Sequence, residues 1–225
     1  MKILAVDTST MMSSISILDG DKIIGDMSIN QEQTHSEKLV VLIKRLLDDL
    51  KITLKDIDLF AISKGPGSFT GLRIGMTTLK AMAQALDKDI IGVSTLEAMA
   101  FSILNNENIL SIIDARGSRY FAGFYRNKNN NLEKEFERII ENEELFEFVK
   151  KLDNVVIVGD AIEKLPDEIK KLENVILSPA SLNNSITRNI CVIAKNRYEQ
   201  GLIDNYLDLE PNYLRKSQAE INLKK

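Results

Sequence analysis

The order of predicted elements occurs twice along this chain, and this repetition limits the fold more than any other feature of the sequence. In the first part, alternating and apolar runs predict strands, and leucines at helical spacing predict helices. The predicted order is three strands, a helix, a strand, a helix and a strand, over residues 2–8, 13–18, 22–29, 35–50, 58–63, 71–86 and 90–93. Asp19-Gly20 is a typical hairpin turn between the second and third strands.

The second part repeats this order with small changes. Its predicted strands and helices cover residues 109–115, 120–125, 133–140, 142–151, 155–158, 160–172, 175–177 and 182–200. Pro166 interrupts the helical pattern of one of them, and a break near 102–108 separates the two copies. We therefore expect an N-terminal lobe over residues 1–104 and a C-terminal lobe over 105–225, with the last helix and the tail packing back on the first lobe.

Each copy predicts a mixed five-stranded sheet. Hairpin-length connections make the first strands antiparallel, and the short strand-to-helix linkers that follow favour parallel pairing. The expected fold class is therefore α/β, a duplicated actin-like fold (ASKHA, ribonuclease H-like) with two lobes and helices flanking each sheet. Actin, sugar kinases and the Hsp70 ATPase share this layout, but a shared fold does not establish that this chain uses ATP.

The charge of the chain argues against direct binding of nucleic acid. The net charge is −4 with a pI of about 5.3, whereas proteins that hold nucleic acid by themselves usually carry a basic stripe. The single cysteine, Cys191, excludes an intrachain disulfide and favours a cytoplasmic location. We expect no signal peptide and no membrane association, because the first apolar run stops at Asp7 and no run reaches the ~20 residues of a membrane span.

A glycine-rich turn precedes the second predicted helix, and residues 63–75 read SKGPGSFTGLRIG. The stretch lacks the G-x-x-x-x-G-K-[ST] pattern of a P-loop and misses the G-x-G-x-x-G spacing of a dinucleotide site. N–H groups at a helix start can still bind an anion. We favour a structural role, a tight turn that orients the helix, with Ser68 or Thr70 as its cap. The residues of this helix-orienting turn are Gly65, Pro66, Gly67, Ser68, Thr70 and Gly71.

The first two predicted helices carry apolar or small residues around most of their circumference. Val40 and Val41 widen the stripe of the first helix, and Gly75 and Ala83 allow close packing on the second. A helix that packs only on its own sheet needs a stripe of about 100°. The wider pattern favours a second buried face against a partner protein, although a helix sandwiched between layers of this chain also explains it.

The few candidate catalytic residues have simpler structural interpretations. Asp7-Thr8-Ser9 follows the first strand, where actin-like enzymes place a catalytic or magnesium-linked carboxylate, but an acidic strand end with a Thr/Ser turn explains it equally. One histidine and one cysteine cannot supply the ligands of a zinc site. His35, the only histidine, lies in a T-x-x-E capping box with Thr34 and Glu37, which accounts for it without catalysis.

Several segments together resemble the TsaB family, also called YeaZ. They are LAVDTS, THSEKL, GPGSFTGLRIG, VSTLEAMA, DARGSRYFAGFY and PNYLR, and they extend over nearly the whole chain. GPGSFTGLRIG is the most specific of them. Members of this family are actin-like subunits of the bacterial machinery that makes threonylcarbamoyladenosine on tRNA, next to the anticodon, so the resemblance implies this role.

The resemblance implies a non-catalytic subunit that binds and activates its catalytic partner, TsaD, through the two N-terminal helices. Without TsaD, these helices are expected to pair in a homodimer. The implied interface residues are His35, Leu39, Leu42, Ile43, Leu72, Arg73, Met76, Leu79 and Met82. The ATPase TsaE is expected to join the complex, TsaC to supply threonylcarbamoyl-adenylate, and tRNA to be reached only indirectly.

The resemblance also implies that this chain has no metal, cofactor or catalytic residue of its own. TsaD carries two metal-binding histidines four residues apart, and Thr95 and Met99 occupy the matching positions here. The main alternative is an ATP-dependent enzyme of the sugar-kinase type, with Asp7 and the 65–71 turn in a nucleotide cleft. A hydrolase based on Ser or Thr is a weaker alternative because the chain has a single histidine. The tail over residues 213–220 has no assigned role.

Overall fold

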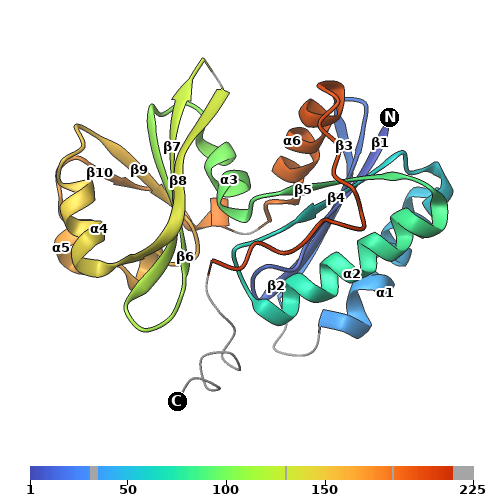
Figure 1. Cartoon of the computed structure of the whole chain (residues 1–225), viewed down its shortest axis with the longest axis horizontal. Coiled ribbons are helices and arrows are strands. Elements are labelled where there is room, and N and C mark those ends of the chain that lie inside the picture. The colour runs from blue at the N-terminus through green and yellow to red at the C-terminus, as the bar shows by residue number, and fades with distance from the viewer. Residues whose placement is uncertain (31–34, 130, 184, 215–225) are drawn as a thin grey trace. The chain divides into compact units, whose positions relative to one another are not determined.

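The computed structural model describes residues 1–30, 35–129, 131–183 and 185–214 (Figure 1). The chain divides into two compact units. The first consists of Met1–Ala98 and Ser185–Asn212, and the second of Met99–Asn184 with the end of the chain from Tyr213. None of the helices in the described ranges has the length and apolar character that crossing a membrane requires.

The first unit contains a five-stranded sheet in the order β3-β2-β1-β4-β5. The strands are β1 (Lys2–Asp7), β2 (Met12–Asp19), β3 (Lys22–Asn30), β4 (Leu59–Ser63) and β5 (Asp89–Val93). β2 pairs antiparallel with both β1 and β3, whereas β4 runs parallel to β1 and β5 runs parallel to β4. β4 is buried along its whole length, as expected for a central strand with helices on both faces of its sheet.

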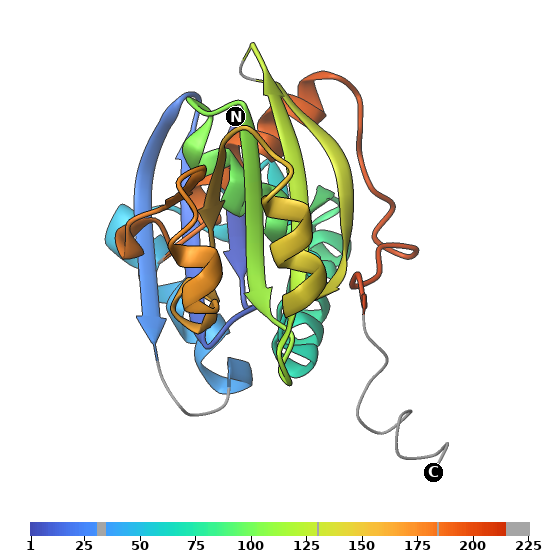
Figure 2. The same ribbon diagram turned by 90° about the vertical axis from the view of Figure 1, so that its left-hand side faces the viewer.

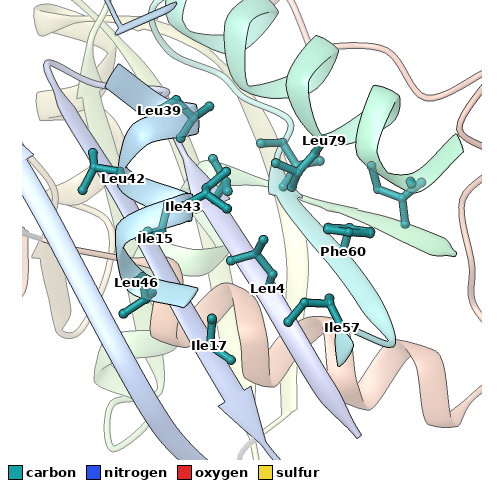
Figure 3. Close-up of a cluster of buried hydrophobic side chains, with 14 of the residues drawn as sticks. Leu4, Ile15, Ile17, Leu39, Leu42, Ile43, Leu46, Ile57, Phe60 and Leu79 are labelled. Carbon is teal, nitrogen blue, oxygen red and sulfur yellow. The ribbon is translucent and has the colours of Figure 1, made fainter. Parts of the chain in front are cut away.

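Three long helices belong to this unit: α1 (His35–Leu50), α2 (Phe69–Leu86) and α6 (Thr187–Glu199). α1 and α2 lie on one face of the sheet, and α6 lies on the other (Figure 1). Leu4 of β1 points into the core beneath α1 and α2 (Figure 3), so its neighbour Ile3 points to the α6 face. Cys191 of α6 is fully buried, with its Sγ atom 3.9 Å from the carbonyl oxygen of Ile3.

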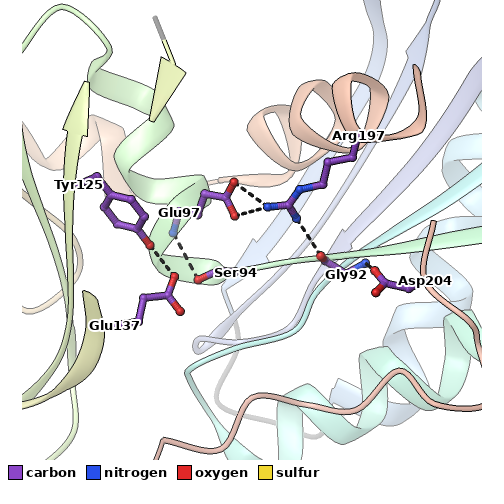
Figure 4. Close-up of polar contacts among 7 residues, drawn as sticks. All are labelled: Gly92, Ser94, Glu97, Tyr125, Glu137, Arg197 and Asp204. Carbon is purple, nitrogen blue, oxygen red and sulfur yellow. Dashed lines mark hydrogen bonds and ion pairs between the residues drawn. The ribbon is translucent and has the colours of Figure 1, made fainter. Parts of the chain in front are cut away.

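The segment after α6 is anchored along β5, at the edge of the same sheet (Figure 4). Asp204 forms an isolated antiparallel bridge with Ile90, and its carboxylate accepts a hydrogen bond of 2.8 Å from the N–H of Gly92. Arg197 of α6 donates to both carboxylate oxygens of Glu97 at 2.7 Å, and to the carbonyl oxygen of Gly92 at 3.0 Å. Ion pairs and backbone contacts therefore hold the C-terminal part of the chain on the first unit.

The second unit contains a five-stranded sheet in the order β10-β9-β6-β7-β8. The strands are β6 (Asn108–Asp114), β7 (Arg119–Lys128), β8 (Asn131–Glu141), β9 (Val155–Val158) and β10 (Val175–Leu177). Helices α4 (Asn142–Val149) and α5 (Asp167–Lys170) lie side by side over one face of this sheet (Figure 2). The core beneath them includes Phe124 and Phe148, whose rings pack edge to face with centroids 5.0 Å apart.

The two sheets have the same strand order when β1–β5 are matched in sequence to β6–β10. The pairing directions also match, because β6-β7-β8 are antiparallel and β9 and β10 follow β6 in parallel. The predicted duplication of a mixed five-stranded sheet flanked by helices is therefore confirmed.

Some helical predictions differ from the structure. The expected helix over 160–172 is a 3-10 turn at Ile162–Lys164 followed by α5, because Pro166 has no N–H to continue a helical ladder. The helix expected over 182–200 begins only at Thr187. The helix α3 (Thr95–Ala100) was not predicted, nor were the 3-10 turns at Leu54–Asp56, Phe101–Ile103 and Ala180–Asn183.

The first unit ends its first stretch at Ala98, close to the boundary drawn at residue 104, and it also includes the last helix, which was expected to pack back on the first lobe. The segment Ser185–Asn212 returns to the first unit. The reason is the buried side of α6, where Ile190, Cys191 and Ala194 are fully buried and the helix covers a sheet face that α1 and α2 leave open. The first unit is thus built from two distant stretches of sequence.

Candidate partner-binding helices and the glycine turn

α2 begins at a turn that is pressed against the end of β1. A Cβ atom on Gly67 would lie 2.3 Å from the carbonyl oxygen of Ser9, and one on Gly71 would lie 2.0 Å from the carbonyl oxygen of Thr8. Both distances are far below van der Waals contact, so neither position admits a side chain without movement of the backbone. The two glycines are therefore required by the close approach of two backbone segments.

Hydrogen bonds join this turn to the same strand end. The N–H of Ser68 donates to the carbonyl oxygen of Ser9 at 2.6 Å, and Oγ1 of Thr8 donates to the carbonyl oxygen of Gly71 at 2.7 Å. Ser68, one of the two predicted caps, is the N-cap of α2, since its Oγ accepts the N–H of Gly71 at 3.3 Å. These contacts fix the direction of α2 relative to the sheet. The remaining residues of the turn are the buried Gly65 and Pro66 and the exposed Thr70.

The carboxylate of Asp7 is enclosed in the first unit, with 3% of the residue exposed. Its Oδ1 atom accepts a hydrogen bond of 2.5 Å from Oγ of Ser63 and one of 2.9 Å from the N–H of Ser9. No lysine or arginine pairs with Asp7 among the residues that the structure describes. With the glycine turn packed against Thr8 and Ser9, this geometry fits a structural strand end better than a nucleotide cleft.

The structure places most of the implied interface residues in the core of the first unit (Figure 3). These are Leu39, Leu42, Ile43, Leu72, Met76 and Leu79, each at most 4% exposed. Figure 3 labels Leu39, Leu42, Ile43 and Leu79 among them. All but Leu72 join the apolar cluster that includes Leu4, Ile15 and Phe60 of the sheet. A side chain that the sheet already buries cannot also form a surface for another protein, so the assignment of these residues is corrected from interface to core.

Other residues form the outward surface of the two helices. On α1, Val40 is 49% exposed and Val41 is 64% exposed. Of the implied interface residues, Arg73 lies on this surface and Met82 is half-buried, while the side chain of His35 and the capping residue Thr34 lie outside the described residues. Towards its C-terminus, α1 also exposes four charged residues: Lys44, Arg45, Asp48 and Asp49. We give the name outer helix surface to the remaining, mostly uncharged, exposed residues: Val40, Val41, Thr70, Arg73, Thr77, Ala81, Gln84 and Ala85.

The part of this outer helix surface on α2 carries little charge. α2 has 18 residues, of which only Arg73 and Lys80 are charged. Nζ of Lys80 donates to the carbonyl oxygens of Leu207 and Leu209 at 3.4 and 3.0 Å, and the guanidinium of Arg73 lies 4.3 Å from the centroid of the Phe69 ring. Solvent-facing sides of helices normally carry charged and polar residues, whereas the alanines and threonines here form a surface that is easily desolvated.

Other side chains that could bind a metal ion or react with a substrate are buried. Thr95 is fully buried, and Met99 is 2% exposed. Burial raises the pKa of the Cys191 thiol to about 12, so this cysteine is protonated and unreactive at neutral pH. Across the described ranges, no group of three or more His, Cys, Asp and Glu side chains is placed to hold a metal ion.

Solved structures share this fold. YeaZ from Pseudomonas aeruginosa superposes with a TM-score of 0.77 at 22% sequence identity, covering 94% of this chain and 99% of that protein. The activator of 2-hydroxyisocaproyl-CoA dehydratase from Clostridium difficile, solved with ADPNP, gives a TM-score of 0.53 at 12% identity, covering 91% of this chain and 99% of the other. At these identities the likeness shows the fold alone, which is the duplicated actin-like (ASKHA) fold.

Sequence comparisons identify the family. The chain is 33% identical to the tRNA threonylcarbamoyladenosine biosynthesis protein TsaB of Buchnera aphidicola (Schizaphis graminum), over 74% of this chain and 81% of the relative. It is 37% identical to TsaB of Bacillus subtilis, but that match covers 59% of this chain and only 58% of the relative. A family model described as "TsaD: tRNA N6-adenosine threonylcarbamoyltransferase" matches residues 22–223. The chain therefore belongs to the family that this model describes and, within it, to the TsaB proteins.

Proposed function

We propose that this chain is a non-catalytic subunit that binds TsaD and activates it in threonylcarbamoyl transfer to N6 of the adenosine next to the anticodon of tRNA. The names of its relatives assign them to the biosynthesis of this modified nucleoside. The matching family model describes the transferase itself. A chain related to both suits a supporting subunit of the machinery that carries out the transfer.

The observation that carries the proposal is the outer helix surface. Val40 and Val41 expose apolar side chains on α1, and α2 adds threonine and alanine side chains with a single exposed arginine. Small uncharged side chains lose little free energy on desolvation and let two helices approach to 8–10 Å between axes. This surface supports packing of the two helices against helices of TsaD, and against those of a second copy of the chain when TsaD is absent.

Catalysis is assigned to TsaD because the matching positions here are unsuited to metal chemistry. Thr95 offers a hydroxyl and Met99 a thioether at the positions matched to the two metal-binding histidines of TsaD, and both side chains are buried. Neither group replaces histidine as a ligand of zinc or non-haem iron. We infer that the chain acts indirectly, through the pose in which it holds the catalytic subunit.

The remaining partners follow from the same proposal. TsaE joins the complex of the two subunits, and TsaC supplies the threonylcarbamoyl-adenylate that TsaD consumes. The tRNA is held mainly by other components, which agrees with a net charge of −4 on this chain. Because the threonylcarbamoyl group is transferred to tRNA, the proposed location is the cytoplasm.

The substitution Ala81→Glu tests the proposed surface. Ala81 is exposed, so a glutamate there keeps its water contacts in the free chain, but it loses them against a partner helix. An unpaired buried charge costs several kcal/mol, about 2–5, and we expect the affinity for TsaD to fall by at least about tenfold. Asn196→Glu, on the exposed side of α6, is the matched control and should bind TsaD like the wild type in isothermal titration calorimetry.

Reconstituted tRNA modification provides the second measurement. The reaction contains tRNA, TsaC, TsaD, TsaE, ATP, threonine and bicarbonate, with the wild-type chain, with either variant, or without the chain. We expect full product formation with the wild type and Asn196→Glu, and little with Ala81→Glu or without the chain. Unchanged TsaD binding by Ala81→Glu would overturn the surface, and full product without the chain would overturn the activating role. ATP hydrolysis by the chain alone would instead favour the sugar-kinase alternative.

A further inference from the structure

The segment that follows α6 crosses β5 and then runs beside α2, where it is drawn in red in Figure 1. Nζ of Lys80 on α2 donates to two backbone carbonyl oxygens of this segment, at 3.4 and 3.0 Å. Further along, the N–H of Asn212 donates to the carbonyl oxygen of Lys64, the residue before the glycine turn, at 2.6 Å. We call residues 204–212 the C-terminal strap. The strap is thus joined both to α2 and to the turn that orients α2.

The strap makes a tight, well-bonded turn at Leu207. Oδ1 of Asn205 accepts the N–H of Leu207 at 2.8 Å, and the carbonyl oxygen of Asn205 accepts the N–H of Leu209 at 2.9 Å. The two carbonyl oxygens that Lys80 binds are those of Leu207 and Leu209. Leu209 is 6% exposed and packs into the core of the first unit. The backbone of Leu207 is therefore held on both sides, and its position relative to α2 is fixed.

The side chain of Leu207 is left in water. Leu207 is 68% exposed, the highest fraction of any large apolar residue in the part of the chain that the structure describes, and Val41 of the outer helix surface follows at 64%. Single exposed leucines are common, but this one is fixed beside a helix face of small uncharged residues. Because its backbone is already ordered, little conformational entropy is lost when a partner covers it. Leu207 is therefore suited to contact another protein.

Two acidic residues of the strap follow this leucine. Asp208 and Glu210 are exposed, and neither forms an ion pair with another residue in the described ranges. On α2, the exposed residues one turn before and after Lys80 are the uncharged Thr77 and Gln84. The negative charge thus lies on the strap, at the border of the outer helix surface. A complementary partner would present lysine or arginine side chains at this border.

We propose that the C-terminal strap extends the partner-binding surface, and that Leu207 inserts into an apolar pocket of TsaD bordered by lysine or arginine. The inference rests on the proposed binding of TsaD by the outer helix surface, which the strap continues beyond Lys80. A leucine buried at this border adds apolar area that the alanines and threonines of α2 cannot provide. Asp208 and Glu210 would attract the basic side chains during the approach of TsaD.

The substitution Leu207→Asn tests the apolar contact. Because Leu207 is mostly exposed, we expect an unchanged melting temperature and unchanged hydrogen-exchange protection over residues 204–212. The affinity for TsaD, measured by isothermal titration calorimetry, should fall about tenfold. Leu202→Asn is the matched control, since Leu202 is 57% exposed but its N–H donates to Arg197 at the end of α6, on the other face of the sheet from α2. This control should bind TsaD like the wild type.

The double variant Asp208→Asn/Glu210→Gln tests the charged border. Charges at the rim of an interface act mainly on the rate of association. We expect TsaD to associate about threefold more slowly at low salt, with a weaker dependence of the association rate on salt and little change in the dissociation rate. Surface plasmon resonance measures both rates. An association rate equal to that of the wild type at low salt would contradict the proposed charge complementarity.

The outcomes separate this inference from the proposed function. If Ala81→Glu weakens TsaD binding and Leu207→Asn leaves it unchanged, the outer helix surface stands and the role of the strap is overturned. A wild-type chain that does not bind TsaD would overturn both. Sedimentation velocity of the free chain provides the remaining comparison. If Leu207→Asn disrupts a homodimer but leaves TsaD binding unchanged, the occupant is a second copy of this chain, and the assignment to TsaD is wrong.

Discussion

The turn after β1 and the turn after β6 occupy matching places in the two sheets, yet their surroundings differ. Each follows an aspartate that ends the central strand, Asp7 in the first sheet and Asp114 in the second. Each carboxylate accepts the N–H two residues later, at 2.9 Å from Ser9 and at 2.8 Å from Arg116. The second donor is the neutral hydroxyl of Ser63 for Asp7, whereas Asp114 is paired with a charged lysine.

The segments that follow β4 and β9 account for this difference. After β4, the glycine turn lies directly on Thr8 and Ser9 and leaves no space beside the first turn. After β9, Gly159 makes a comparable approach, with a Cβ position 1.9 Å from the carbonyl oxygen of Ile112, but the chain then continues into a short 3-10 turn that contains Lys164. The duplicated backbone thus keeps its aspartate turn in both units, while the next segment determines whether the turn is covered or open.

Of the substitutions that test the contrast between the two turns, Gly71→Ala is expected to cause the largest loss in the free energy of unfolding. The added methyl group would lie 2.0 Å from the carbonyl oxygen of Thr8, so either the helix or the strand end must move. We expect a loss of about 3 kcal/mol or more in the free energy of unfolding. Gly117→Ala, in the open turn, meets only the end of Arg119 at 3.8 Å and should lose about 1 kcal/mol for its left-handed backbone. Urea unfolding measures both, and equal losses would contradict the contrast between a covered and an open turn.

A smaller difference in the free energy of unfolding is expected when a serine close to each aspartate turn is replaced, namely Ser63 at the end of β4 and Ser118 in the turn after β6. Ser63→Ala removes a hydrogen bond of 2.5 Å to the buried Asp7 carboxylate and should cost about 1–2 kcal/mol. Ser118→Ala removes an exposed hydroxyl and should change the free energy of unfolding by less than about 0.5 kcal/mol. Thermal unfolding of the two variants beside the wild type checks this, and a destabilising Ser118→Ala would show that the second turn is also closely packed.

The smallest expected effect is a change in the pKa of Asp114 when its partner Lys164 is replaced. Burial raises the pKa of this carboxyl, but the hydrogen bond and charge of Lys164 and the N–H of Arg116 outweigh it, so the pKa lies below the ordinary aspartate value. A lowered pKa in the folded state stabilises the fold at pH values above the ordinary aspartate range, and this contribution is lost as pH falls through the lowered pKa. We expect Lys164→Met to raise the pKa of Asp114, which NMR of the carboxyl carbon measures. An unchanged titration curve would show that the ion pair does not persist in solution.

Features that depend on a few neighbouring residues could be predicted from the sequence. The helix at His35–Leu50 and the strand at Val155–Val158 lie at the predicted residues, since their apolar spacing and flanking residues are local. The cap of α2 was narrowed to Ser68 or Thr70 for the same reason, and the structure shows that it is Ser68. The duplication was visible because each unit repeats the same local signals in the same order.

Features that depend on distant segments could not be predicted in this way. Leu79 and Ala81 are both apolar residues of α2, and only the position of the sheet determines that Leu79 is buried and Ala81 exposed. A glutamate at Leu79 would disrupt the core, whereas a glutamate at Ala81 would remain in water in the free chain. A cavity that Arg116 and Lys164 line also escaped detection, because these two residues are separated by nearly 50 residues in sequence and are brought together by the second sheet.

A ribosome makes β1–β5, together with α1 and α2, before it makes the strands of the second sheet, and it makes α6 after them. Residues 99–184 emerge in between and contain every strand of the second sheet, so the second unit can fold while the first still lacks the helix over one of its faces. Domains usually fold in the order of synthesis, and here the order of completion is reversed. Until α6 arrives, Ile3 and Leu18, which pair across β1 and β2, leave apolar surface open on the nascent chain, and this is the stage at which chaperones have most to bind.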